Sequence, residues 1–299
     1  MVSPPSDFTL MRMASHWLGT FPAMASPCQL LIETPDPVTA EQFTALVQIE
    51  TKRIERKFSR YRKDNIIHQI NSAEGSSTQV DKETAQLLEF ANTCYKLSDG
   101  LFDVTSGVLR KIWKFDGSQP IPAAAAIERL LHVVGWEKVR WQAPQLTLRK
   151  GMEIDLGGIG KEYAVDRCFE LLKAQTTLPF LLNFGGDLRV SGPRLNGQAW
   201  RVGVEDPTMQ EIASKEIDLR GGAIATSGDS QRFLLHQGKR YSHILNPKTG
   251  CPVENAPRSV TVAAPTTIEA GMLATFASLH GKNAESFLQS QGVQHWVLR

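Results

Sequence analysis

The segment EIDLGGIGKEYAVDR, residues 153–167, contains the residues whose types and spacing most directly suggest chemistry. Asp155 ends a predicted short strand, three glycines predict a turn, and Lys161 begins a predicted amphipathic helix. A strand, a glycine turn and a helix bring backbone N–H groups close to a phosphate, and Lys161 adds a cation there. Because no Ser or Thr follows the lysine, this is not a Walker loop. The plain alternative is a turn that only packs a helix on a sheet.

Three further polar clusters punctuate the chain, namely FDVT at Phe102–Thr105, TSGD at Thr226–Asp229 and SHILNPKTG at Ser242–Gly250. Each has a simple structural explanation when it is taken alone. Asp103 could cap a helix, the TSGD segment could be a turn, and His243 could be a half-buried histidine. The clusters carry more information through their combination and their order along the chain.

In that order the clusters resemble the FAD:protein FMN transferases, the ApbE-type flavin transferases. The resemblance runs from about residue 17 to the end of the chain. The matching segments are Met24 in FPAMAS, Phe58–Tyr61 (S-x-Y) with Asn71 downstream, Gly100–Thr105 (G-x-F-D-x-T), Asp155–Asp166 (D-L-G-G-I-x-K-x-Y-A-x-D), Asn183–Asp187 (N-x-G-G-D), Thr226–Gly228 (T-S-G) and His243–Gly250 (H-I-x-D-P-x-T-G).

The resemblance implies a reaction. Members of this family bind FAD and Mg²⁺, split the pyrophosphate, and move the FMN half onto a Thr or Ser hydroxyl of a flavoprotein, so that AMP leaves. The metal would neutralise the anionic pyrophosphate, and Mg²⁺ is usually held by few protein oxygens together with substrate phosphates. The implied cofactor is therefore Mg²⁺, and the implied partners are FAD and an acceptor flavoprotein subunit with a Thr- or Ser-bearing motif.

The resemblance also assigns roles to single residues. Tyr61 would stack on a flavin or adenine ring, and Lys161 would meet phosphate. His243 would either transfer a proton, as the catalytic residue, or contact a phosphate. The full set implied for FAD binding is Met24, Tyr61, Leu101, Phe102, Asp103, Asp155, Lys161, His243 and Ile244.

For the metal, the resemblance implies the carbonyl of Gly158 and two positions on a late helix, 271 and 275. The family pattern there is A-D-x-x-x-T, and this chain has AGMLAT at Ala270–Thr275. Gly271 and Thr275 share a helix face, so the hydroxyl is in place while the carboxylate is missing. Asn246 likewise replaces the Asp of H-I-x-D-P-x-T-G. We expect the two lost negative charges to weaken Mg²⁺ binding.

Three hypotheses follow. The chain is an active FMN transferase with a weakened metal site, or an FAD-binding member with a degenerate metal site and little or no transferase activity. A third possibility is a pyrophosphatase that cuts FAD to FMN and AMP with water as the acceptor. We favour the first, because the other motifs are intact and Mg²⁺ often relies on substrate phosphates.

Helices and antiparallel-looking hairpins alternate without a regular βαβ rhythm, which predicts an α+β fold with mixed, largely antiparallel sheets flanked by helices. Helical spacing and capping residues predict helices at Thr39–Arg60, Asp81–Ser98 and after the capping box at Thr266. Alternating segments and turn residues predict hairpins at Val139–Leu148 and Phe180–Ser191.

The composition, with 41% hydrophobic and 21% charged residues among 299, is that of an ordinary globular protein. A net charge of +2 gives no reason to expect nucleic acid or an anionic membrane as a partner, and no run approaches the length of a membrane-spanning helix. The four scattered cysteines suggest neither a zinc site nor a redox pair. We expect residues 1–16 to be a flexible tail, residues 17–299 to form one domain, and the protein to be cytoplasmic.

Overall fold

An antiparallel sheet is the largest layer of the structure, a computed structural model that describes residues 7–116, 120–205, 213–228 and 233–299. Within these ranges the sheet has eight strands in the spatial order β1-β2-β3-β7-β8-β11-β14-β15, and each neighbouring pair is antiparallel. The strands are β1 (Thr9–Arg12), β2 (Trp17–Ala23), β3 (Ser26–Ile32), β7 (Phe180–Phe184), β8 (Asp187–Val190), β11 (Gly222–Gly228), β14 (Ser259–Ala264) and β15 (His295–Leu298).

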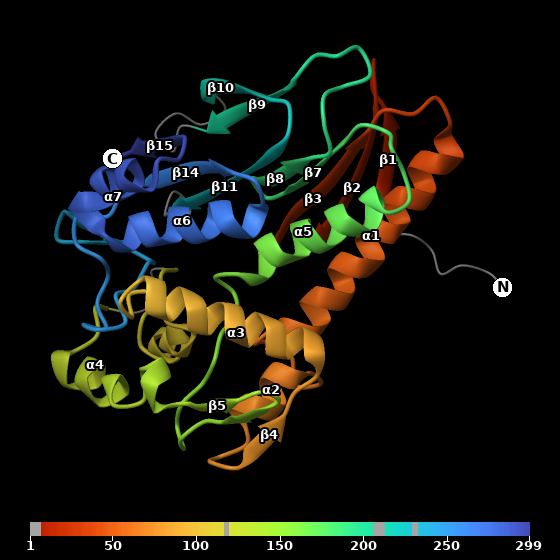
Figure 1. Cartoon of the computed structure of the whole chain (residues 1–299). Coiled ribbons are helices and arrows are strands. Elements are labelled where there is room, and N and C mark those ends of the chain that lie inside the picture. Colours follow the sequence, from red (N-terminus) through yellow and green to blue (C-terminus); the bar gives the residue numbers. More distant parts are fainter. Residues whose placement is uncertain (1–6, 117–119, 206–212, 229–232) are drawn as a thin grey trace.

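Three helices cover one face of this sheet, namely α1 (Pro37–Phe58), α5 (Gly160–Lys173) and α6 (Thr267–Leu279) (Figure 1). The first of them shows why these residues form helices. Asp36 caps α1 by accepting hydrogen bonds from the N–H groups of Val38 and Thr39 at 3.1 and 3.0 Å. The buried side chains then recur at three- or four-residue intervals, as the helical period requires, at Ala40, Thr44, Val47, Thr51, Ile54 and Phe58.

A second region lies at the C-terminal end of α1, below the large sheet in Figure 1. It contains α2 (Ile66–Asn71), α3 (Lys82–Leu97), η1 (Val104–Lys111), α4 (Ala124–Leu131), η2 (Trp136–Lys138) and a small sheet of β4 (Ser77–Gln79), β5 (Arg140–Gln142) and β6 (Gln145–Thr147). The remaining described elements are the pairs β9 (Trp200–Glu205) with β10 (Ala213–Leu219) and β12 (Phe233–His236) with β13 (Lys239–Ser242), and η3 (Gly281–Asn283) and α7 (Ala284–Gln291).

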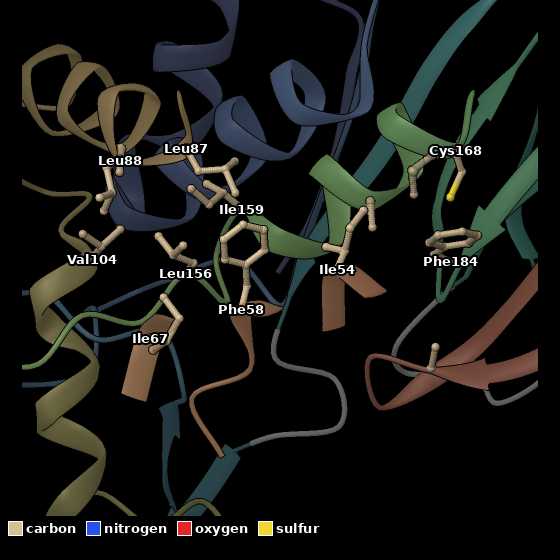
Figure 2. Close-up of a cluster of buried hydrophobic side chains, with 14 of the residues drawn as sticks. Ile54, Phe58, Ile67, Leu87, Leu88, Val104, Leu156, Ile159, Cys168 and Phe184 are labelled. Atoms are coloured by element: carbon tan, nitrogen blue, oxygen red, sulfur yellow. The ribbon is translucent and has the colours of Figure 1, made fainter. Parts of the chain in front are cut away.

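One cluster of buried side chains joins the large sheet to this second region. Figure 2 shows Phe58 of α1 and Leu88 of α3 on either side of Leu156 and Ile159, which flank the glycine turn. The glycine turn therefore lies where the two regions meet, and residues from both of them reach it.

The expected α+β class is confirmed, and so are the predicted helices and hairpins, with ends shifted by one or two residues. For example, the helix expected at Thr39–Arg60 is α1 at Pro37–Phe58. Two features differ. Residues 9–12, expected within a flexible tail, form β1 and pair with β2. The strand expected to end at Asp155 is absent, because described residues 152–156 belong to no strand.

A side chain replaces the missing strand partner. The amide of Asn71 donates to the carbonyl of Ile154 at 3.0 Å and accepts from its N–H at 2.8 Å, and Asp155 N–H donates to the carbonyl of Val104 at 2.8 Å. A side-chain amide offers the same donor and acceptor as a peptide group, so this segment is held extended without a ladder. Asp229, the last residue of the TSGD segment, lies outside the described residues.

The helices within the described ranges include none that is both long enough and apolar enough to cross a membrane.

Candidate functional site

The glycine turn is held by buried side chains on either side of it, and two of its glycines are exposed to solvent. Leu156, with 1% of its surface exposed, and buried Ile159 anchor its two ends, while Gly157 and Gly158 are exposed. Gly157 N–H donates to Asp155 Oδ1 at 2.9 Å, which shapes the turn. Helix α5 begins directly afterwards, and its N-cap residue, Ile159, makes no side-chain cap hydrogen bond. Gly160 N–H donates to the carbonyl of Leu156 at 2.8 Å, so what this helix start offers an anion is the positive end of its dipole and the N–H groups that follow.

A cavity of about 400 Å³ opens beside Asp155. Tyr61 stands at it with 78% of its surface exposed, and the guanidinium of Arg60 lies 4.9 Å from the centre of the Tyr61 ring. The lining is mostly polar and rich in positive charge, and consists of Arg60, Tyr61, His68, Asn71, Ser72, Gly107, Arg110, Lys111, Lys114, Glu153, Ile154 and Asp155. An exposed aromatic ring next to several cations suits a ligand with both rings and phosphates.

Asp155 organises the wall of this cavity. Its Oδ2 accepts from Arg60 Nη1 at 3.1 Å and lies 3.3 Å from Arg110 Nη1. A carboxylate already paired with two arginines holds these cations in place rather than binding an anion itself. The sequence predicted Asp155 and Tyr61 at the site and missed Arg60 and Arg110. Arg60 stands inside the S-x-Y segment, so its position in that motif was the available signal.

Lys161 lies on the other side of the turn. Its Nζ is 2.9 Å from Oδ2 of Asp187, whose side chain is 1% exposed, and 3.4 Å from the carbonyl of Gly185. Burial lowers the pKa of Lys161, but the attraction of Asp187 and Glu162 outweighs it and raises the pKa overall. Lys161 is therefore a cation at neutral pH. Its partner Asp187 belongs to the predicted N-x-G-G-D segment and was not predicted as a site residue.

Met24 reaches the same place from the turn between β2 and β3. It has a positive φ of 52°, and its N–H donates to Glu55 Oε1 at 2.7 Å. Two residues later, Ser26 lies against Gly185, since a Cβ at Gly185 would be 2.6 Å from the Ser26 Cβ. The turn that contains Met24 therefore packs against the turn between β7 and β8, and Lys161 lies beside Gly185 in that second turn.

The loop before η1 contains Leu101, Phe102 and Asp103. The Asp103 carboxylate is occupied within the protein, because Oδ1 accepts from Thr105 N–H at 2.8 Å and Oδ2 accepts from Trp136 N–H at 2.9 Å. Burial raises the pKa of Asp103, and these hydrogen bonds oppose that rise. The Asp103 side chain caps η1 and holds the loop, as its structural explanation predicted. Its contribution to FAD binding stays a prediction.

His243 and Ile244 follow β13. The His243 ring is half-buried and meets the edge of Phe115 at 6.3 Å between ring centres, next to Lys114 of the cavity wall. Trp113 stacks on Phe115 and donates from Nε1 to the carbonyl of Gly250 at 2.8 Å. The predicted H-I-x-D-P-x-T-G segment is therefore fastened to the segment that lines the cavity.

Two of the three predicted metal positions, Gly271 and Thr275, lie on α6, and the third, Gly158, lies in the glycine turn before α5. Gly158 sits against Phe102, since a Cβ at Gly158 would be 3.2 Å from Phe102 Cε2, and the Phe102 ring is 6.0 Å from that of Phe276, next to Thr275. Gly271 is buried on α6. The described residues contain no group of three or more His, Cys, Asp or Glu that could hold a metal ion by itself. The predicted set of Gly158, Gly271 and Thr275 contains no carboxylate, so a metal held there would depend largely on phosphate oxygens.

Glu162, which sequence reasoning missed, faces Gly271 from α5. A Cβ at Gly271 would lie 2.6 Å from Cγ and 2.8 Å from Oε1 of Glu162. Burial, together with repulsion from Asp187, raises the pKa of Glu162. The available signal was a carboxylate at the unspecified position after Lys161 in the motif.

The chain belongs to the ApbE family, whose model matches residues 24–297. Among curated proteins it is similar to an FAD:protein FMN transferase of Klebsiella pneumoniae (strain 342), with 30% identity over 312 residues, 99% of this chain and 85% of the relative. It is also similar to the FAD:protein FMN transferase of Escherichia coli (strain K12), with 27% identity over 297 residues, 96% of this chain and 82% of the relative.

Solved structures agree with this assignment. The ApbE protein of Thermotoga maritima has a TM-score of 0.86 at 29% identity, with 94% of each chain covered. The apo form of the flavinyl transferase ApbE of Pseudomonas stutzeri has a TM-score of 0.84 at 25% identity, with 97% of this chain and 93% of that chain covered. The fold described above is therefore the ApbE fold.

Proposed function

We propose that the chain is an FAD:protein FMN transferase that attaches FMN through a phosphoester to a Thr or Ser of a target flavoprotein. The observation that carries this proposal is a basic cavity with an exposed Tyr61, lined by Asp155 directly before the glycine turn and the paired Lys161. The names of the relatives support the transferase over a degenerate FAD-binding protein.

In this reaction the acceptor hydroxyl oxygen forms a bond to the phosphorus of the FMN half, and the bond from that phosphorus to the bridging oxygen breaks. AMP leaves with that oxygen, and the hydroxyl proton is removed. The cations around the cavity, Arg60, Arg110, Lys111 and Lys114, attract the diphosphate, and Tyr61 offers a face on which a ring can stack.

The residues present fit a magnesium ion. Gly158 offers a main-chain carbonyl and Thr275 a hydroxyl, and the carboxyl group of Glu162 fills the space beside Gly271, where the motif lacks its own carboxylate. When bound, Mg²⁺ supplies neutralisation of the charge on the diphosphate oxygens. Lys161 stays charged beside Asp187 and contributes a further positive charge at the same turn.

His243 is the proposed proton-transfer group, and contact with a phosphate is its alternative role. The two are separated with His243→Gln, by measuring FAD affinity and the rate of transfer. Proton transfer predicts that the rate falls while FAD affinity is kept. A phosphate contact predicts that FAD affinity falls as well.

The test of the proposed function uses the full chain with FAD, Mg²⁺ and a flavoprotein subunit bearing a Thr-containing motif. AMP release is followed by chromatography and the mass of the acceptor by mass spectrometry. A gain of one FMN by the acceptor, dependent on Mg²⁺, is expected. AMP and FMN release without a modified acceptor would instead establish the pyrophosphatase alternative.

A matched pair of lysine variants ties the activity to the cavity. Lys114→Ala removes a charge from the cavity wall, and Lys150→Ala removes one from an exposed lysine that pairs with exposed Glu74. We expect Lys114→Ala to weaken FAD binding by roughly threefold to tenfold, as for loss of one nearby charge in a hydrated site, and Lys150→Ala to leave it unchanged. Equal effects of the two variants would place the FAD site elsewhere.

A further inference from the structure

Helices α5 and α6 contact each other in antiparallel steps of one helical turn. Asp166 of α5 accepts hydrogen bonds from the N–H groups of Thr267 and Ile268 at 3.0 and 2.9 Å, and so caps the start of α6. One turn earlier on α5, Glu162 meets Gly271, one turn later on α6. Residues four apart share a helix face, so Glu162 lies on the face of α5 that faces α6.

The Glu162 side chain occupies the space that a side chain at position 271 would need. A Cβ there would lie 2.6 Å from Cγ, 2.8 Å from Oε1 and 3.0 Å from Cδ of Glu162. Such distances are too short for carbon atoms in contact, so Glu162 and a larger residue at 271 exclude each other in this arrangement. A glycine inside a helix is unfavourable, and here it makes room for a carboxylate from the neighbouring helix.

One oxygen of the Glu162 carboxylate also lacks a hydrogen-bond partner among the residues that the structure describes. This oxygen, Oε2, is buried. Asp187 Oδ2 likewise makes no hydrogen bond to a described residue, but it forms an ion pair with Lys161 at 2.9 Å, and Asp166 pairs with Arg189 at 2.9 Å. A buried, unmatched carboxylate oxygen is unfavourable unless a cation or donor meets it.

We propose that Glu162 supplies to Mg²⁺ the carboxylate that the family pattern places at position 271, acting together with the Gly158 carbonyl and the Thr275 hydroxyl. In this proposal the carboxylate ligand comes from α5 instead of α6. Gly271 then provides the space that the Glu162 side chain occupies. This proposal rests on the proposed function, which requires a metal at this site, and it makes the missing Asp at position 271 a relocation rather than a loss.

The step from Gly271 to Thr275 supports this placement. Thr275 follows one turn after Gly271 on α6, and Phe102 links its neighbour Phe276 to Gly158. Asp166 meets Thr267 and Glu162 meets Gly271, so the next step of this antiparallel register would set the glycine turn at Gly158 opposite Thr275.

The test measures metal binding itself. Free Mn²⁺, used as a paramagnetic substitute for Mg²⁺, is titrated by electron paramagnetic resonance into the full chain in the presence of FAD, with a protein-free FAD blank. Glu162→Gln keeps the shape of the side chain and removes the charge, and we expect it to weaken Mn²⁺ binding about tenfold or more. Glu170→Gln, on an exposed part of the same helix, is the matched control and should bind as the parent does.

A second variant moves the carboxylate back. Glu162→Gly combined with Gly271→Asp restores the pattern of the family, and we expect Mn²⁺ affinity within about threefold of the parent, whereas Glu162→Gly alone should bind about tenfold more weakly. Thermal unfolding without metal verifies that each variant folds. Parental Mn²⁺ affinity in a folded Glu162→Gln, or no Mn²⁺ binding by the parent chain, would overturn the proposal.

These outcomes separate the proposal from the proposed function. If Glu162→Gln loses metal affinity but the parent transfers no FMN to the acceptor, the metal ligand is correct and the transferase function is wrong. If the parent transfers FMN and Glu162→Gln binds metal normally, the function stands and Glu162 is not a ligand.

Discussion

The buried pair of Lys161 and Asp187 gives a prediction whose size follows from the structure. Asp187 is 1% exposed, its Oδ2 is 2.9 Å from Lys161 Nζ, and its Oδ1 accepts from Thr226 N–H at 3.2 Å. Asp187→Asn keeps the shape and the acceptor for Thr226, and removes only the negative charge. The cation of Lys161 is then left without its partner.

Removing one member of a buried ion pair typically destabilises a protein by about 3–5 kcal/mol, because the other charge stays buried and unpaired. Two features reduce this value here. The Lys161 side chain is 28% exposed, so water partly replaces the lost partner. Asp187 also repels Glu162, and the substitution relieves that repulsion. We therefore expect Asp187→Asn to lower the free energy of unfolding by about 2–3 kcal/mol.

Urea unfolding at pH 7 of the parent, Asp187→Asn, Lys161→Met and the double variant tests this value. Because the two residues form one pair, the double variant should be destabilised by less than the sum of the single variants. Asp218→Asn is the control, since Asp218 lies 3.9 Å from Arg201 on an exposed surface and should change stability by less than about 0.5 kcal/mol. Additive effects, or an Asp187→Asn variant as stable as the control, would refute the assignment of a coupled buried pair.

Three further predictions concern the surroundings of the turn. Leu156→Ala removes a side chain that is 1% exposed in the cluster of Figure 2, and should lower the free energy of unfolding in urea by about 2–5 kcal/mol; a loss under about 1 kcal/mol would show that the turn is not anchored there. Burial raises the pKa of Glu83, but hydrogen bonds from Arg53 and Lys57 outweigh it and lower the pKa from 4.5 to about 2. A carboxylate whose pKa is lowered on folding contributes stability above its unfolded pKa, and this contribution is lost as the pH falls. The difference in the free energy of unfolding between the parent and Glu83→Gln, measured in urea, should therefore shrink between pH 4.5 and about pH 2. A difference that stays constant over this range would contradict the lowered pKa. Tyr61→Ala should weaken FAD binding by about tenfold in a fluorescence titration, because stacking on a ring contributes about 1–3 kcal/mol, and should leave the melting temperature unchanged because Tyr61 is 78% exposed; unchanged FAD affinity would remove Tyr61 from the site.

Local patterns predicted most of the elements. The helical spacing and capping of α1 and α3 and the turn compositions of the hairpins at 139–148 and 180–191 depend on residues close together in the chain. The prediction of a strand before Asp155 was wrong because the backbone of that segment depends on a contact with a residue far away in the chain. Its apolar pattern is real, but the side chain of Asn71, 83 positions earlier than Ile154, supplies the hydrogen bonds that a strand partner would have made.

The sequence by itself determined the order and identity of the motif residues, and therefore the family expectation that the comparisons confirmed. Only the tertiary structure decided which of these residues meet. The pairing of Arg60 with Asp155, of Lys161 with Asp187, and of Glu162 with Gly271 joins segments that are 26 to 109 positions apart or that share no local pattern. Such contacts depend on how α5 packs on α6 and on the sheet. In the sequence Gly271 looks like a lost metal ligand, and only the packing of the two helices shows that the Glu162 side chain fills the space beside it.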